Sequence, residues 1–219
     1  MESLKGKVIA VTGASRGIGQ AIAHEFAQRG ANVVLVSRDQ QRLDEVLREL
    51  PRKTDSRHLA VEIDIMDEES VNNGFDSIFN MFPDIDVLVN NAGIAFFDQI
   101  MDISGEAWDM MMKTNLKGAF LCTKRALPGM ITKRSGHIFN ISSVSGIKAF
   151  PYNTAYSASK AGLLAFGNSL REEVRKHGVK VVNIIPGATD TPIWDELNGE
   201  FDRSKMVDKT DIAKTILEI

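Results

Sequence analysis

Apolar and polar positions alternate along this chain in two regular patterns. Short, largely apolar runs rich in Val and Ile occur at residues 8–11, 33–36, 87–89, 138–141 and 179–185, and residues 59–65 alternate in polarity. Between these runs, apolar residues recur at helical spacing within 21–27, 43–50, 71–79, 105–133 and 154–177. Continuous apolar runs are typical of parallel strands covered on both faces. The pattern therefore predicts a doubly wound α/β domain, a parallel sheet in three α/β/α layers with right-handed crossovers.

Prolines mark breaks in the predicted helices. Pro51 and Pro83 each end one of them. Pro128 lies inside the longest predicted helix, residues 105–133, where a proline removes a backbone donor, so we expect a kink or an interruption there. The chain has no internal repeat, low-complexity segment or linker, and we predict a single domain over residues 1–219.

Composition and charge exclude several classes of protein. With 219 residues, 43% of them hydrophobic and 25% charged, the chain resembles a globular domain that buries a core without disulfides. Its net charge of −3 disfavours nucleic acid as a partner. No apolar run is long enough to cross a membrane and residues 1–7 leave no room for a signal peptide, so we expect a cytoplasmic protein. We interpret Cys122, the only cysteine, as a core residue, and predict no metal because the four histidines lack ligand spacing.

A glycine-rich turn joins the first predicted strand to the first predicted helix. Its sequence is Thr12-Gly13-Ala14-Ser15-Arg16-Gly17-Ile18-Gly19. The first glycine permits a tight turn, the second lets the backbone approach a pyrophosphate, and the third lets helix and strand pack closely. The helix N-terminus offers free N–H groups and a positive dipole end to the phosphates. In this context the turn predicts a dinucleotide site with contacts from Gly13, Ser15, Arg16, Gly17, Ile18 and Gly19.

The residues after the second predicted strand bear on which dinucleotide binds. An NAD site usually places an acidic residue there to bond the ribose hydroxyls, but this chain has Ser37 followed by Arg38. Together with Arg16, Arg38 would offer fork-shaped donors to a 2′-phosphate, which favours NADP(H). The alternative is that Arg38 is a solvated loop cation and that Asp39 serves a ribose hydroxyl.

A tyrosine and a lysine lie four residues apart in the predicted helix 154–177. At this spacing, Tyr156 and Lys160 share one helix face. A free phenol titrates near pH ~10, and a nearby ammonium, together with the positive charge of an oxidised nicotinamide, would lower its pKa. Such a pair also occurs by chance in surface helices, so it gains weight only from the other motifs.

Taken together, the motifs resemble those of the short-chain dehydrogenase/reductase family. They are Thr12–Gly19, Asn90-Asn91-Ala92-Gly93, Asn115, Ile141-Ser142-Ser143, Tyr156–Lys160 and Pro186-Gly187 with Thr191. Their order and spacing are similar to those of the family from residue 5 to about residue 191, and within it to the 3-oxoacyl-(acyl carrier protein) reductase and carbonyl reductase branch. The resemblance implies a Rossmann fold.

The resemblance also implies residue roles. Tyr156 would be the general acid in reduction, Lys160 would lower its pKa and bond the nicotinamide ribose, and Ser143, rather than Ser142, would bond the substrate carbonyl. Asn115 would hold a water of a proton relay, although a structural amide bonded to the backbone is the alternative. The implied further cofactor contacts are Asp64, Ile65, Asn91, Ala92, Gly93, Pro186, Gly187, Thr189 and Thr191, with a structural role in joining strands as the alternative for Asn91.

The segment 189–207 would form a substrate lid in this family, or else an ordinary surface helix. It contains Pro192, Ile193, Trp194, Leu197, Phe201 and Met206, and a second apolar wall is expected from Ala95, Phe96, Phe97, Phe150 and Tyr152. These walls suit a small carbonyl or alcohol substrate, including an acyl thioester. If a carrier protein delivers it, the basic pairs Lys133-Arg134 and Arg175-Lys176 are candidate contacts, or else solvated helix ends.

Family members usually continue into a last strand after the helix that 211–219 represents, so we expect that strand to be missing. A homodimer through helices 105–133 and 154–177 is expected, and a tetramer is left open. Two other functions stay open: a specialised reductase or dehydrogenase for a pterin, sugar, steroid or secondary alcohol, and a non-catalytic NADP-binding regulator. Regulators of that kind usually lose the tyrosine or lysine that this chain keeps.

Overall fold

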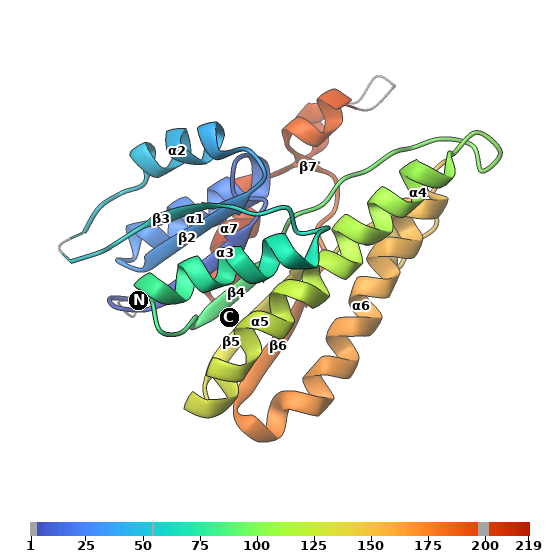
Figure 1. The fold of residues 1–219 in the computed structure, drawn as a ribbon. Helices are drawn as coiled ribbons and strands as arrows, with labels where there is room; N and C mark the ends of the chain where they lie inside the picture. Colours follow the sequence, from blue (N-terminus) through green and yellow to red (C-terminus); the bar gives the residue numbers. More distant parts are fainter. Residues whose placement is uncertain (1–3, 54, 197–201) are drawn as a thin grey trace.

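A six-stranded parallel sheet forms the centre of the protein (Figure 1). The computed structural model describes residues 4–53, 55–196 and 202–219. The strand order is β3-β2-β1-β4-β5-β6. The bounds are β1 Val8–Thr12, β2 Asn32–Ser37, β3 Leu59–Glu62, β4 Val87–Asn90, β5 Gly136–Ile141 and β6 Val179–Ile184. The predicted doubly wound parallel sheet is confirmed, and it belongs to a single Rossmann-like domain.

Helices cover both faces of the sheet, which confirms the three layers. Their bounds are α1 Gly17–Gln28, α2 Gln40–Glu49, α3 Glu68–Met81, α4 Gly105–Met112, α5 Gly118–Lys133, α6 Thr154–Val174 and α7 Lys209–Leu217. One core cluster joins β1 through Val8 and Ala10 to α3, α5 and α6, and the other joins β1 through Ile9 and Val11 to α1, α2 and α7. Successive side chains of β1 thus enter opposite layers, as the period of a strand requires.

The long predicted helix 105–133 is irregular, but not where the sequence predicted. A π-helical segment, η1 (Lys113–Lys117), lies between α4 and α5, whereas α5 is unbroken through Pro128. The predicted interruption at Pro128 is therefore wrong. Pro128 is exposed, and so is Lys124, whose carbonyl the proline leaves without its helical donor, so water can replace that bond.

Two smaller expectations are resolved by the fold. Cys122 is fully buried, and burial raises the pKa of its thiol to about 12, which is the behaviour of a core residue. The run 59–65 is a strand only to Glu62, so Ile63, Asp64 and Ile65 are free to form a loop beside the cavity.

Beyond β6 the chain forms a second, two-stranded sheet and a last helix. The two-residue strands β7 (Thr189–Asp190) and β8 (Val207–Asp208) pair in parallel, and α7 then packs on α1. In the described part of the chain the main sheet has β6 as its edge, without a further strand. Within the described ranges, no helix combines the length and apolar character needed to span a membrane.

Candidate active site

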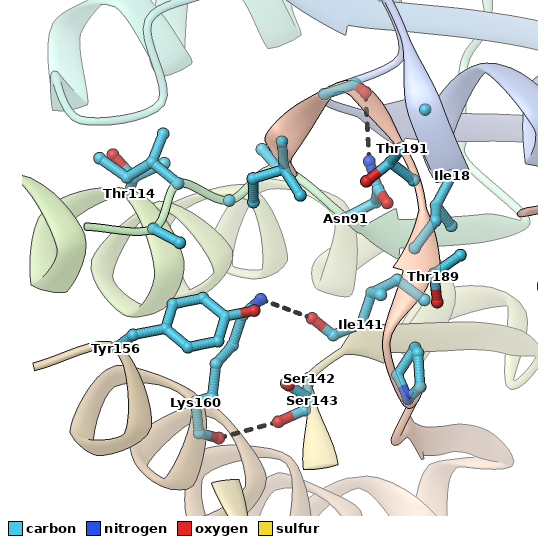
Figure 2. Close-up of a pocket in the computed structure, with 18 of the residues that line it drawn as sticks. Ile18, Asn91, Thr114, Ile141, Ser142, Ser143, Tyr156, Lys160, Thr189 and Thr191 are labelled. Carbon is cyan, nitrogen blue, oxygen red and sulfur yellow. Dashed lines mark hydrogen bonds between the residues drawn. The ribbon is translucent and has the colours of Figure 1, made fainter. Parts of the chain in front are cut away.

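A cavity of about 410 Å³ opens at the carboxyl ends of the strands. In parallel α/β sheets this edge is where ligands bind. Of the predicted cofactor contacts, Gly19 is the only one that does not line the cavity, and Ser143 lines it as well. Figure 2 shows Tyr156 and Lys160 facing Ile141, Ser142 and Ser143, with Thr189, Thr191, Ile18 and Asn91 on the other side.

The glycine turn has no room for side chains at two positions. Gly13 has a φ of +64°, and a Cβ added there would lie 2.8 Å from the Cα of Ala92. A Cβ at Gly19 would collide with the carbonyl oxygen of Gly13. Gly19 is therefore a packing residue that lets α1 approach β1. The N-terminus of α1 begins at Gly17 on the cavity wall, where its N–H groups and dipole fit the phosphates of a dinucleotide.

Asn91 ties two strand ends together. Its amide nitrogen donates to the carbonyl oxygens of Thr12 at 2.8 Å and Gly13 at 3.1 Å. The hydroxyl of Thr12 accepts hydrogen bonds from the backbone nitrogens of Asn91 and Ala92 at 3.0 and 3.1 Å. The structural alternative for the Asn91 side chain therefore holds, and the cavity is lined by a turn that these bonds keep rigid.

The cavity end near Ser37 and Arg38 is basic. Ser37 donates to the hydroxyl of Ser15 at 3.2 Å, which brings the second strand against the glycine turn. Arg16 and Arg38 both line the cavity. Asp39 instead caps α2, accepting from the Arg42 backbone at 3.0 Å, and its other oxygen pairs with the Arg42 side chain at 3.2 Å. Because its carboxylate is engaged in the cap and the ion pair, the alternative that it serves a ribose hydroxyl loses support.

Lys160 is buried under the candidate tyrosine. Its ammonium donates to the carbonyl oxygen of Ile141 at 2.9 Å and lies 5.8 Å from the centre of the Tyr156 ring. Burial lowers the pKa of Lys160 to about 8 because the protein interior disfavours its charge. Ser142 is also buried and donates to the Lys160 carbonyl at 2.9 Å, which gives Ser142 a structural role.

The side chains of Tyr156 and Ser143 both line the cavity and influence each other there. Burial raises the pKa of Tyr156, and the neighbouring Ser143 side chain partly offsets that rise. The lowering expected from Lys160 is not among the causes of this shift, which are burial and the Ser143 side chain. The contribution of an oxidised nicotinamide remains a prediction.

Asn115 lies in the π-helical segment, and its side chain is fully engaged. Its Oδ1 accepts from the Ile94 backbone at 2.8 Å, and its Nδ2 donates to the Ile94 carbonyl and to Ser159, both at 2.9 Å. These bonds match the structural alternative. A Cβ at Gly93 would lie 3.3 Å from both Asn115 Oδ1 and Lys160 Nζ, so the fold brings the two residues together. The water-relay role of Asn115 remains a prediction.

The substrate end of the cavity combines an aromatic wall with polar groups. Phe97 lies between Tyr156 and Trp194, with ring centroids 5.7 and 6.4 Å apart. Ala95 and Phe150 also line the cavity, whereas Phe96 and Tyr152 do not and are corrected. Sequence reasoning missed Ser145 and Asn153, which line it as well. The signal was available, since they lie two residues after Ser143 and three before Tyr156.

The predicted lid is partly visible, and the predicted carrier contacts are misplaced. Residues 189–196 and 202–207 are described, whereas Leu197 and Phe201 lie outside the described residues. Lys133 pairs with Asp84 and Asp86, which precede β4, so it lies at the amino edge of the sheet, opposite the cavity. Arg134 bonds the Lys176 carbonyl at 3.1 Å on the same edge. Both helices run antiparallel to the strands, which is why their basic ends lie away from the site.

Comparisons with known proteins agree with this geometry. The family described as short chain dehydrogenase matches residues 7–201. The chain is similar to an oxidoreductase of Staphylococcus saprophyticus, at 40% identity over 99% of this chain and 92% of that protein. It is also similar to the 3-oxoacyl-[acyl-carrier-protein] reductase of Aquifex aeolicus, at 39% identity over 90% of this chain and 80% of that protein.

The fold of this chain is also similar to those of solved structures. An L-sorbose reductase from Gluconobacter frateurii, complexed with NADPH and L-sorbose, has a TM-score of 0.89 and 31% identity, covering 98% of this chain and 89% of that one. A 3-ketoacyl-(acyl-carrier-protein) reductase from Brucella melitensis, complexed with NADH, has a TM-score of 0.90 and 28% identity, covering 98% of this chain and 90% of that one.

Proposed function

This chain belongs to the short-chain dehydrogenase/reductase family of oxidoreductases, and on that premise we propose that it reduces a ketone or aldehyde to an alcohol with NADPH. One observation carries the proposal. The side chains of Ser143 and Tyr156 line the same cavity as the glycine turn and lie near enough for Ser143 to lower the pKa of the phenol, so a carbonyl oxygen between their hydroxyls would meet two donors.

In the proposed reaction, Ser143, Tyr156 and Lys160 would have separate roles. A bound NADPH would supply the hydride. Ser143 and Tyr156 would bond the carbonyl oxygen as negative charge develops on it, and Tyr156 would then give it a proton. Lys160, with its pKa near 8, can exchange protons close to neutral pH and would help to restore the proton on the phenol.

The preference for NADPH rests on the basic end of the cavity. Arg16 and Arg38 would hold the 2′-phosphate, and Asp39, the carboxylate that could serve a ribose hydroxyl instead, already caps α2 and pairs with Arg42. The L-sorbose reductase relative carries NADPH, whereas the 3-ketoacyl reductase relative carries NADH. Kinetics with both cofactors in parallel test the preference of this chain.

For the substrate, the aromatic wall of Phe97, Phe150 and Trp194 favours a carbonyl flanked by apolar groups, including 3-oxoacyl thioesters. We also propose a homodimer through α4, α5 and α6, whose exposed apolar side chains include Trp108, Met110 and Phe120. A specialised sugar or steroid reductase and a non-catalytic regulator remain alternatives. Activity assays on a panel of carbonyl compounds, run with NADPH and NADH in parallel, distinguish a general carbonyl reductase from a specialised reductase and from a non-catalytic regulator.

The decisive variant is Tyr156→Phe. It removes the proton donor but keeps the ring that packs on Phe97. We expect turnover to fall by at least about a hundredfold, the usual contribution of a general acid, while NADPH affinity stays close to that of the wild type. Turnover comes from the loss of reduced-nicotinamide absorbance and affinity from calorimetry. Wild-type turnover by this variant would refute the assignment.

A further inference from the structure

Arg203 joins two segments that lie apart in the chain. Its guanidinium pairs with Asp190 at 3.1 Å and with Asp195 at 3.0 Å, and it donates a short hydrogen bond to the Thr191 carbonyl. All three partners belong to residues 188–196, which we name the cover segment. One guanidinium therefore contacts this segment at three points, through a hydrogen bond to Thr191 and ion pairs with Asp190 and Asp195.

The cover segment borders both halves of the cavity. Six of its residues line it: Ala188, Thr189, Thr191, Pro192, Ile193 and Trp194. Thr191 lies against the glycine turn, since a Cβ at Gly17 would be 3.5 Å from the Thr191 Cβ. Trp194 donates to the Thr189 carbonyl at 2.8 Å and contacts Phe97, which contacts Tyr156. Movement of the segment would therefore alter the phosphate end and the substrate end together.

On its other side, Arg203 is connected to the core. The chain beyond it forms β8, where the Val207 nitrogen donates to the Ala188 carbonyl at 2.8 Å. Next comes α7, whose Ala213 and Ile216 are buried against the layer that contains α1. Arg203 thus ties the cover segment to a helix that is anchored in the core.

We propose that Arg203 is a positioning residue that holds the cover segment against the bound cofactor and substrate. The guanidinium also compensates Asp190 and Asp195, two carboxylates that flank Thr191 near the predicted phosphate site. The side chains of Arg203, Asp190 and Asp195 are 38%, 53% and 63% exposed, so salt screens these ion pairs and the hold is reversible. The cofactor part of this inference rests on the proposed function.

The test uses the full chain with Trp108→Phe, because the chain has two tryptophans and this change leaves Trp194 as the only one. Arg203→Ala is compared with Arg203→Lys and with the matched control Lys205→Ala. Lys205 lies on the same short helix, is 83% exposed and pairs only with Asp202 among the described residues. Acrylamide quenching reports the accessibility of Trp194 without cofactor, and calorimetry reports NADPH affinity.

We expect Arg203→Ala to increase Trp194 quenching and to weaken NADPH binding by about three- to tenfold, the range for losing exposed ion pairs. KM for the carbonyl substrate should rise more than kcat falls. Arg203→Lys keeps the charge without the planar guanidinium, so its Trp194 quenching and NADPH affinity should lie between those of Arg203→Ala and the parent. Lys205→Ala should match the parent in both measurements. Raising salt should increase quenching in the parent and not in Arg203→Ala.

The outcomes separate this inference from the proposed function. If the parent does not bind NADPH, the proposed function fails, yet Trp194 quenching still tests the hold of Arg203. If Arg203→Ala folds and matches the parent in quenching, salt response and NADPH affinity, the proposal is overturned. If Arg203→Ala does not fold, Asp195→Asn removes one of the ion pairs, and unchanged Trp194 quenching in that variant would overturn the proposal.

Discussion

Replacing Gly13 by alanine tests the physical basis of the cofactor site. An alanine at position 13 would destabilise the fold for two reasons. The backbone there has a φ of +64°, which L residues rarely adopt, and the added Cβ would lie 2.8 Å from the Cα of Ala92. Gly6 is a matched control. Its φ of +81° imposes the same kind of backbone strain, but a Cβ there meets nothing within 4 Å.

The two variants separate strain from crowding. Left-handed backbone costs an L residue about 1–2 kcal/mol, and the lower entropy of unfolded alanine offsets about 0.4–1 kcal/mol of this. We therefore expect Gly6→Ala to lower the free energy of unfolding by about 1 kcal/mol. Overpacking adds about 1–3 kcal/mol at Gly13, so Gly13→Ala should cost about 2–4 kcal/mol in total. The neighbour is backbone, so it cannot move aside as a side-chain end could.

Urea denaturation without cofactor measures both free energies, and calorimetry measures NADPH affinity. Because Ala92 and Gly13 both line the cavity, displacing either should weaken NADPH binding at least about tenfold, which corresponds to about 1.4 kcal/mol. Gly6 does not line the cavity, so its variant should bind NADPH like the wild type. Equal losses of stability in the two variants would refute the close approach of Gly13 to Ala92.

Two further predictions concern charged residues. The pKa of Lys160 is about 8 in the folded protein against 10.5 for the free side chain, so folding disfavours the charged form of this lysine. The resulting loss of folding free energy is fully present below about pH 8. The stability of the fold therefore rises as the pH increases from about 8 to 10.5. The pKa shift corresponds to a destabilisation of about 3 kcal/mol, which Lys160→Met would remove, while loss of the hydrogen bond to Ile141 would cost about 1 kcal/mol. Lys160→Met should therefore stabilise the fold at pH 7 by about 2 kcal/mol, yet it should abolish turnover. Denaturation at several pH values measures this, and a destabilised Lys160→Met with unchanged pH dependence would contradict it. Arg38→Ala should raise the KM for NADPH at least about tenfold, since charge-assisted bonds contribute about 1.5–3 kcal/mol and about 1.4 kcal/mol corresponds to a factor of ten, and should leave the KM for NADH nearly unchanged. Equal effects on both cofactors in steady-state kinetics would contradict a 2′-phosphate contact.

The fold and the cofactor end of the site could be predicted because their signals are local. Apolar runs and helical periodicity identified the sheet and its covering helices. The glycine turn was recognisable because its requirements, a positive φ at Gly13 and contact between helix and strand at Gly19, are properties of consecutive residues. Tyr156 and Lys160 were recognisable for the same reason, since four residues in a helix fix their relative position.

Other features depended on contacts between distant segments. The π-helical segment at Asn115 was missed, while Pro128 drew the prediction of a break because proline is visible in a sequence and a helical register change is not. The basic helix ends at Lys133 and Arg134 were assigned to the site, but antiparallel packing of helix on strand places them at the opposite edge. The engagement of Asp39 with Arg42 depended on where α2 begins.

By itself, the sequence determined the layered fold, the glycine turn and which side chains are candidates for the chemistry, because periodicity and short-range spacing encode them. Tertiary structure alone decided how burial acts on those side chains, raising the pKa of Tyr156 and lowering that of Lys160, and how Arg203 reaches the cover segment. The physical reason is that desolvation and ion pairing depend on which distant groups surround a side chain, and only the packed chain brings those groups together.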